Sequence, residues 1–406
     1  MHKHLKGLAA VALAAAVLLT AGIAVAGEAK YPDRIVLHSG PPISGVKILS
    51  ADGKRITYVK FYGEPGKERE ISADRVKEIS LGDAPADLRR AVSDYRKNTQ
   101  KAYEKALGYL EKLPATAGRE WLYAPYKLTL HADCLMKLGK QSEALPKYAQ
   151  VISRYRKSFY FLQAIDGKAK AHNVLKQYEE AAKTFLELDP KDNYRVLGAN
   201  QPYGKLWQLR GRFGMASALA KLPADAAKAG VIYSGLVEVC GKILANPPKE
   251  LSGSVAEITV MHQRSLVGKA EVLMNSGQLD AARQWITSIH PRVKDKAARL
   301  TLFMALGELS MKAGDKATDA TEKKVKYKEA LLAYMRVYIL YPDQKAQRPR
   351  AMLRAGNASE LLGTRPDNTR AVAIYKELVT EFPKTPEAED ARKRLEALGV
   401  RLRGHK

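Results

Sequence analysis

Residues 126–156 read YKLTLHADCLMKLGKQSEALPKYAQVISRYR, and this stretch decides the fold. Apolar and small residues recur in it every three or four positions, a spacing that gathers them on one face of an α-helix. These positions are Leu128, Leu135, Ala144, Tyr148 and Val151. Gly139 divides the pattern in two, and glycine suits the left-handed conformation in which many helices end. The stretch therefore predicts two helices joined by a tight turn.

The second half of this stretch returns along the chain as a small residue followed, four positions later, by an aromatic one. The pairs are Ala144 and Tyr148, Ala181 and Phe185, Ala330 and Tyr334, and Ala371 and Tyr375. The alanines are 37 residues apart in the first two pairs and 41 apart in the last two. Self-similarity at this period is typical of an array of helical hairpins. The small residue lets two helices approach, and the aromatic ring fills the space beside it.

The same pattern extends over further units, at 165–190, 266–289, 303–342 and 352–383. In residues 126–156 and in these units, the order of small, apolar and aromatic positions resembles the tetratricopeptide repeat. The ending EFPKTPEA at 381–388 resembles tetratricopeptide proteins of the bacterial cell envelope. The resemblance implies a mainly α chain, in which a right-handed α-solenoid of about five to seven helix pairs spans 87–398. It also implies a non-enzymatic scaffold whose partner binds along the concave face.

Three stretches depart from the repeat. Residues 314–325 and 364–368 widen the turns of two units, and we expect them to form loops. The region 190–260 fits poorly and predicts one degenerate hairpin between loops at 198–204 and 246–253. Insertions in repeat arrays map to loops and sometimes to binding surfaces, so these stretches are either linkers or sites.

Residues 33–82 differ from the rest because they read as five short strands. Strand-forming residues alternate there, and Asp52-Gly53 is a strong signal for a two-residue hairpin. The segments IVLHSG at 35–40, SGV at 44–46 and DRVKEI at 74–79 resemble Sm-like and SH3-like small β-barrels. The resemblance implies a five-stranded barrel that serves as a cap or docking module. Sm-like relatives often bind RNA, but nothing in these residues indicates base stacking.

The N-terminus predicts export. Lys3 and Lys6 precede an apolar stretch that ends in Ala24-Val25-Ala26, the arrangement of a secretory signal peptide at 1–26. Cleavage after Ala26 would place the protein in the periplasm or outside the cell. The alternative is an uncleaved anchor helix, because the stretch is nearly as long as the roughly 20 residues that span a bilayer.

The chain is strongly basic, with 68 Lys and Arg against 43 Asp and Glu. Loss of residues 1–26 would lower the formal charge from +25 to +23, and a basic tail follows at 399–406. A surplus of this size favours an anionic partner, here an envelope polymer or lipid headgroups, as the alternative to a protein or peptide. The bases are scattered along the chain, so an ordinary solvated surface explains them too. Nucleic acid is not expected for an exported protein.

No motif of a known catalytic site, phosphate-binding loop or metal centre occurs in the sequence. We therefore expect no enzymatic activity, no cofactor and no metal. The two cysteines, Cys134 and Cys240, lie in apolar helical patterns far apart in sequence, which favours two buried thiols over a disulfide.

The first helix of each hairpin lines the concave groove in tetratricopeptide arrays, and that implication selects the candidate partner-binding residues. They are Tyr126, Lys170, Asn173, Arg264 and Asn275. Some family members clamp a terminal carboxylate with bases at such positions. Asp166 stands where that clamp would need a base, so the clamp is not expected here.

Overall fold

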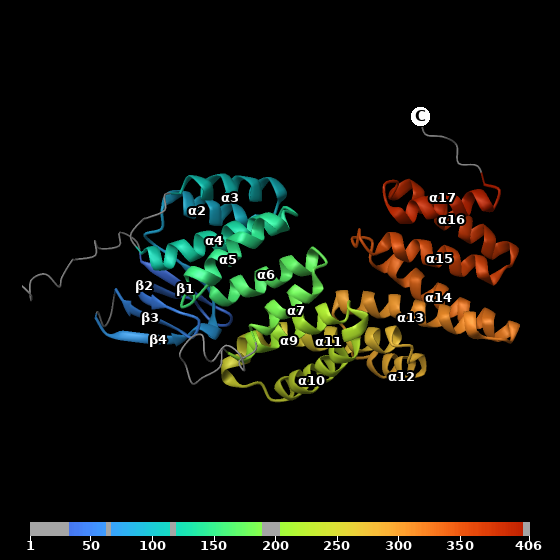
Figure 1. The fold of residues 1–406 in the computed structure, drawn as a ribbon, viewed down its shortest axis with the longest axis horizontal. Coiled ribbons are helices and arrows are strands. Elements are labelled where there is room, and N and C mark those ends of the chain that lie inside the picture. Colours follow the sequence, from blue (N-terminus) through green and yellow to red (C-terminus); the bar gives the residue numbers. More distant parts are fainter. Residues whose placement is uncertain (1–31, 62–65, 114–118, 189–203, 401–406) are drawn as a thin grey trace, which may run out of the picture.

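The structure is a computed structural model, and it describes residues 32–61, 66–113, 119–188 and 204–400. A five-stranded antiparallel sheet comes first and helices follow to the end (Figure 1). The predicted signal peptide, the loop at 198–203 and the end of the basic tail lie outside the described residues. The prediction of a mainly α chain behind a small β module is confirmed.

The strands are β1 (Asp33–Leu37), β2 (Ile43–Ala51), β3 (Arg55–Lys60), β4 (Glu68–Ser72) and β5 (Val76–Ser80). Their order is β4-β3-β2-β1-β5, and a short 3-10 helix, η1 (Ala73–Arg75), links β4 to β5. The predicted turn at Asp52 forms, and its carboxylate accepts bonds of 2.8 Å from the backbone N–H groups of Lys54 and Arg55. Pairing among the described strands ends at β4 and β5. Closure into a barrel stays a prediction.

Consecutive helices then pack as hairpins, in the pairs α2/α3, α4/α5, α6/α7, α9/α10, α11/α12, α13/α14 and α15/α16, with α17 against α15 and α16. The helices are α2 (Ala86–Arg96), α3 (Gln100–Lys112), α4 (Glu120–Lys137), α5 (Gln141–Arg154), α6 (Phe161–Val174), α7 (Tyr178–Leu186), α9 (Lys205–Leu219), α10 (Ala226–Ala245), α11 (Val255–Asn275), α12 (Leu279–Ile289), α13 (Lys296–Lys316), α14 (Ala320–Leu340), α15 (Arg348–Leu362), α16 (Arg365–Glu381) and α17 (Pro386–Ala397). The 3-10 helices η2 (Pro223–Asp225) and η3 (Lys249–Ser254) precede α10 and α11. The handedness of the array stays a prediction.

The recurring aromatic residues hold neighbouring helices together as the sequence predicts. Tyr148, Tyr334 and Tyr375 are almost completely buried. Each ring lies against a glycine of an adjacent helix, so closely that a Cβ there would overlap it. A Cβ on Gly356 would lie 2.2 Å from Tyr375 Cε1. The glycine is therefore needed for the helices to approach.

The prediction of loops is wrong at two places. The stretch at 314–325 lengthens two helices instead, because α13 continues to Lys316 and α14 begins at Ala320. Asp319 caps α14 by accepting a bond of 2.7 Å from the N–H of Glu322. At 364–368 only Thr364 lies outside a helix, and its hydroxyl caps α16. Both insertions supply their own capping residues, which satisfy the free N–H groups of a new first turn.

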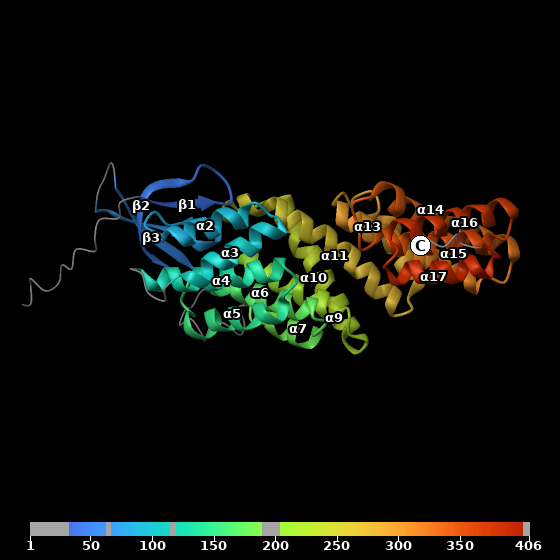
Figure 2. The same ribbon diagram turned by 90° about the horizontal axis from the view of Figure 1, so that it is seen from above.

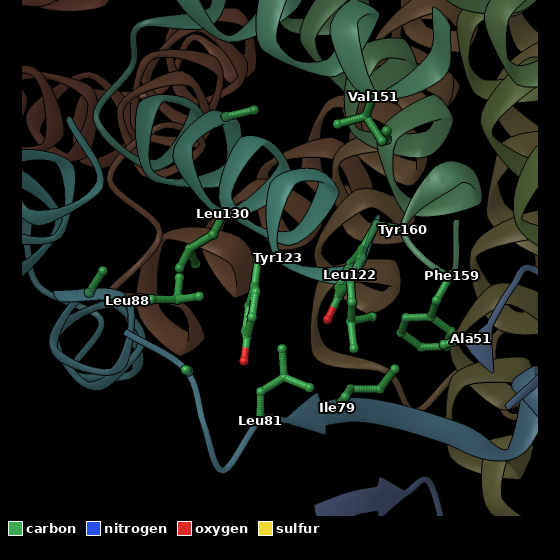
Figure 3. Close-up of a cluster of buried hydrophobic side chains, with 14 of the residues drawn as sticks. Ala51, Ile79, Leu81, Leu88, Leu122, Tyr123, Leu130, Val151, Phe159 and Tyr160 are labelled. Atoms are coloured by element: carbon green, nitrogen blue, oxygen red, sulfur yellow. The ribbon is translucent and has the colours of Figure 1, made fainter. Parts of the chain in front are cut away.

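The sheet shares one apolar core with the helices from α2 to the start of α6. Ile79 and Leu81 at the end of the sheet face Leu122 and Tyr123 of α4 (Figure 3). The carboxylate of Asp33 is buried, accepts from the N–H of Ile48, and pairs with Arg119 at 2.6 Å. The sheet is thus fastened to the array rather than tethered by a linker.

The long helix α11 leads from the sheet end of the molecule toward α13, and α13–α17 form the far end (Figure 2). Its N-terminal end returns to the sheet, because η3 packs against η1. Both cysteines are buried and free, in agreement with the favoured sequence interpretation.

Candidate binding cavity between the sheet and the first helices

A cavity of about 800 Å³ lies between the sheet and the inner helices of the first half of the array. Its walls come from β5 and nearby sheet loops on one side, and from α4, α6, α9 and α11 on the other, and Tyr95 of α2 and Tyr148 of α5 line it too. Each of these four helices is the first of its hairpin, the position predicted to line the groove. The charged lining residues and the histidine are His38, Lys77, Asp133, Lys137, Asp166, Lys170, Arg210 and Glu257.

Asp166 and Lys170 place one ion pair in the wall. They are four residues apart on α6, so they share a face of the helix. The Lys170 Nζ lies 2.5 Å from Asp166 Oδ2. The lysine side chain is 61% exposed and the aspartate only 14%, so the ammonium group extends into the cavity while the carboxylate stays in the wall.

Arg210 and Glu257 join α9 to α11 across the cavity wall. The guanidinium donates two bonds to the carboxylate, Nε to Oε1 at 2.6 Å and a terminal nitrogen to Oε2 at 2.8 Å. It also lies over the ring of Trp207, 4.3 Å from the centroid. Burial opposes ionisation of Glu257, but the bonds and charge of Arg210 outweigh it and keep the pKa of Glu257 below its usual value. This paired arginine is rigidly oriented.

Asp133 is the acid that α4 contributes to the cavity. Burial raises its pKa to about 6, although the hydroxyl of Tyr148 donates to Oδ1 at 2.5 Å and favours the charged form. Tyr148 is the aromatic residue of the first repeat, so a packing residue also orients a polar group in the cavity. Asp133 therefore changes its charge near neutral pH.

His38 closes the cavity on the sheet side. Burial and the positive charges of Arg210 and Lys77 lower its pKa, and the charge of Glu257 opposes them only in part. The imidazole is therefore neutral at pH 7. Together the lining offers acids, bases, a neutral imidazole and the aromatic rings of Tyr95 and Trp207.

The structure does not bring the five predicted contact residues together. Lys170 lines the cavity, and Asn173 lies half-buried farther along α6. Tyr126 instead stacks on Tyr160 with ring centroids 4.9 Å apart, beneath the sheet. Arg264 pairs with Asp295 at 3.3 Å, and Asn275 is exposed at the far end of α11.

Sequence reasoning missed His38, Trp207, Arg210 and Glu257. Trp207, Arg210 and Glu257 lie in the poorly fitting region 190–260, which the sequence did single out as a place to look for function. His38 belongs to the β module and gave no signal, because its place in the cavity depends on the sheet folding back over the array.

Within the described ranges, no group of three or more His, Cys, Asp or Glu is placed to hold a metal ion. No helix in the described part of the chain is both long and apolar enough to cross a membrane.

Comparison with known proteins gives weak similarities to solved helical-repeat structures. No family model matches the sequence, and no curated protein matches it. The C-terminal part of a TPR repeat-containing protein from Cytophaga hutchinsonii is 12% identical, with 75% of this chain and 98% of that one covered and a TM-score of 0.36. The RpL4 assembly chaperone Acl4 is 12% identical, with 77% and 97% covered and a TM-score of 0.31. The TPR domain of P58(IPK) is 15% identical, with 77% and 89% covered and a TM-score of 0.24.

Proposed function

We propose that this chain is an exported, non-enzymatic scaffold that binds an extended segment of a partner protein in the cavity between the sheet and the first helices. One observation carries the proposal. The first helices of four consecutive hairpins direct paired charges and aromatic rings into a single cavity that the sheet closes on one side. A polypeptide offers groups of both charges and apolar side chains, which this lining complements.

The size and charge of the cavity favour a peptide segment over an anionic polymer. Its volume of about 800 Å³ lies in the upper range of ligand sites, which run from about 300 to 1,000 Å³. Asp133, Asp166 and Glu257 stand among its bases, and their carboxylates would repel a polyanion. The excess positive charge of the chain is not concentrated in this site.

The proposal is tested by selecting peptides that bind the purified protein from a displayed random library and measuring their affinities by calorimetry. Lys170→Glu is the test variant, because its ammonium group extends into the cavity. We expect it to weaken selected peptides by roughly tenfold or more, since a like-charge contact in a binding site costs over 1.4 kcal/mol.

Lys183→Glu is the matched control. Lys183 also pairs with an acid of its own helix, Glu180 at 2.8 Å, but it lies on α7, the second helix of the same hairpin. Both variants change the net charge equally, so the control should bind the peptides as the wild type does. Equal affinities for all three proteins would refute the cavity as the binding site.

A further inference from the structure

One face of α14 exposes a row of apolar side chains. Val325, Leu332 and Ile339 are seven residues apart, so they lie on the same side of the helix, about two turns from one another. Their exposed fractions are 49%, 51% and 60%, and Leu340, which follows Ile339, is also 60% exposed. In the described part of the chain, no other helix or strand exposes more than one large apolar side chain. These four residues, which we call the α14 stripe, therefore form an apolar surface that the array itself leaves uncovered.

The departure from the repeat at 314–325 lengthens this stripe. α14 begins ten residues before its repeat alanine, Ala330, whereas α5 begins three residues before Ala144. The residue that corresponds to Val325 in the first repeat is Gly139, which lies in the turn before α5. The extra turns of α14 therefore carry Val325, and the insertion supplies one end of the stripe.

Positive charge flanks the stripe. Lys328 lies between the first two residues of the row, three and four positions from them, and Arg336 lies in the same way between the second and the third. Both bases are exposed, and neither forms an ion pair with a described residue. The guanidinium of Arg336 lies over the ring of Phe303, 5.5 Å from its centroid. An aromatic ring orients this charge but does not neutralise it.

The acids of α14 do not cancel these charges. Glu329 already faces two bases, Lys326 at 3.3 Å and Arg283 of α12 at 3.9 Å. Its Oε2 also accepts a bond of 3.3 Å from the hydroxyl of Ser310 on α13. Glu322 lies in the first turn, where a carboxylate is stabilised by the positive end of the helix dipole. The stripe is therefore an apolar row with an unpaired base on each side.

Segments of the same chain outside the described residues do not complement the α14 stripe. Residues 401–406 follow α17, at this end of the molecule, and contain three Lys and Arg and no acid. Residues 1–31 precede the sheet, which lies at the opposite end (Figure 2), and Glu28 is their only acid. The remaining segments of this kind connect elements of the sheet and of the first half of the array. The occupant of the stripe is therefore another molecule.

We propose that the α14 stripe binds an amphipathic helix of a partner protein, in which apolar residues recur about every seven positions and Asp or Glu flank them. A spacing of seven favours a second helix laid along α14, because apolar residues at that interval form the seam between two packed helices. The bases beside the row would pair with acids beside the partner's seam. The stripe lies in the half of the array away from the sheet (Figure 1), so it goes beyond the proposed peptide cavity and does not depend on it.

Two other occupants complement the stripe less well. A second copy of α14, placed antiparallel about Leu332, would set Lys328 opposite Arg336, and a parallel copy would set each base opposite itself. Either pairing brings like charges together, which repel each other. A lipid surface binds helices with a broad apolar face, whereas the α14 stripe is a narrow row between charged residues. An acidic helix complements both the row and its charges.

The test uses a displayed library of 21-residue helices, the length of α14, with leucine fixed at every seventh position and either Glu or Lys beside it. Helices are selected on the full chain, and their affinities are measured by calorimetry. We expect the selection to enrich Glu. Leu332→Ala and Lys328→Glu should each weaken the selected helices by roughly tenfold or more, because one removes an apolar anchor and the other reverses a complementary charge.

Leu186→Ala and Lys105→Glu are the matched controls. Leu186 is an exposed leucine of α7, and Lys105 is an exposed lysine of α3 that forms no ion pair with a described residue. Both variants should bind the selected helices as the wild type does. Lys170→Glu should also leave this binding intact, so the result is separate from the peptide test.

Selected acidic helices whose affinity falls only in the stripe variants support the proposal. Failure to select any helix, enrichment of Lys, or equal weakening by the controls overturns it. Sedimentation of the wild type as a dimer that Leu332→Ala separates would also overturn it, because the stripe would then bind a second copy. Flotation with phosphatidylglycerol vesicles that Leu332→Ala abolishes would overturn it in favour of a lipid surface.

Discussion

At the scale of single residues, Asp133 shows how a packing position acquires chemistry. Its carboxylate accepts a hydrogen bond from the repeat tyrosine Tyr148 and lies in the wall of the cavity, where desolvation by burial raises its pKa to about 6. The group is thus protonated in the folded protein over a pH range in which it is already ionised in the unfolded chain.

This raised pKa predicts a pH-dependent stability. The stabilising contribution of Asp133 is complete below its unfolded pKa, near 3.8, and is lost as the pH rises through about 6. Asp133→Asn cannot ionise and keeps an acceptor for Tyr148. Between pH 4 and pH 7 the wild type should therefore lose on the order of 2–3 kcal/mol more unfolding free energy than the variant.

Urea unfolding at several pH values measures this difference, and the exposed Asp390→Asn serves as its control. Parallel pH profiles of the wild type and Asp133→Asn would contradict the assignment. A carboxyl resonance of Asp133 that titrates near pH 6 would support it independently.

At the scale of the elements, close approach of helices depends on paired small and aromatic residues. Gly356 of α15 lies beneath the ring of Tyr375 of α16, which is 0% exposed and cannot move aside. Gly108 of α3 offers a contrast, because a Cβ there would meet nothing within 4 Å. Both glycines lie inside an α-helix, but only Gly356 has a side chain of a neighbouring helix packed against it.

Gly356→Ala should destabilise the α15/α16 hairpin by about 1–3 kcal/mol, the usual cost of overpacking a core. Gly108→Ala should instead stabilise α3 slightly, by roughly 0.5–1 kcal/mol, because alanine favours a helix. Amide hydrogen exchange of each hairpin measures both effects locally, which matters because repeats can unfold separately. Loss of protection of similar size in both variants would contradict the packing argument.

At the scale of the whole molecule, the first described strand begins at Asp33, only a few residues beyond the proposed cleavage point after Ala26. The pair between Asp33 and Arg119 fastens that strand to the array. Cleavage after Ala26 would therefore remove no residue of a described strand or helix.

The protein isolated from the cells that make it should begin at Gly27 by N-terminal sequencing. A chain that lacks residues 1–26 should melt at the same temperature as the full chain. An intact N-terminus at Met1 would contradict cleavage, and a marked drop in melting temperature would show that the segment belongs to the fold.

The sequence by itself determined the helices, the hairpins and the five strands, because those depend on periodicity and turn residues within a few positions of each other. It also located Lys170 on a first helix. The sequence wrongly predicted a loop at 314–325. The repeat pattern did not contain the longer helix that Asp319 caps there.

Only the tertiary structure decided where the sites lie. Tyr126 and Arg264 lie on first helices of their hairpins, as Lys170 does, yet the sheet covers one and Asp295 pairs with the other. The cavity forms because the sheet packs back against the array, and Ser39 meets Gly253 where they touch. Contacts between residues so distant in sequence leave no periodic pattern in it. The position of the site therefore depends on tertiary packing.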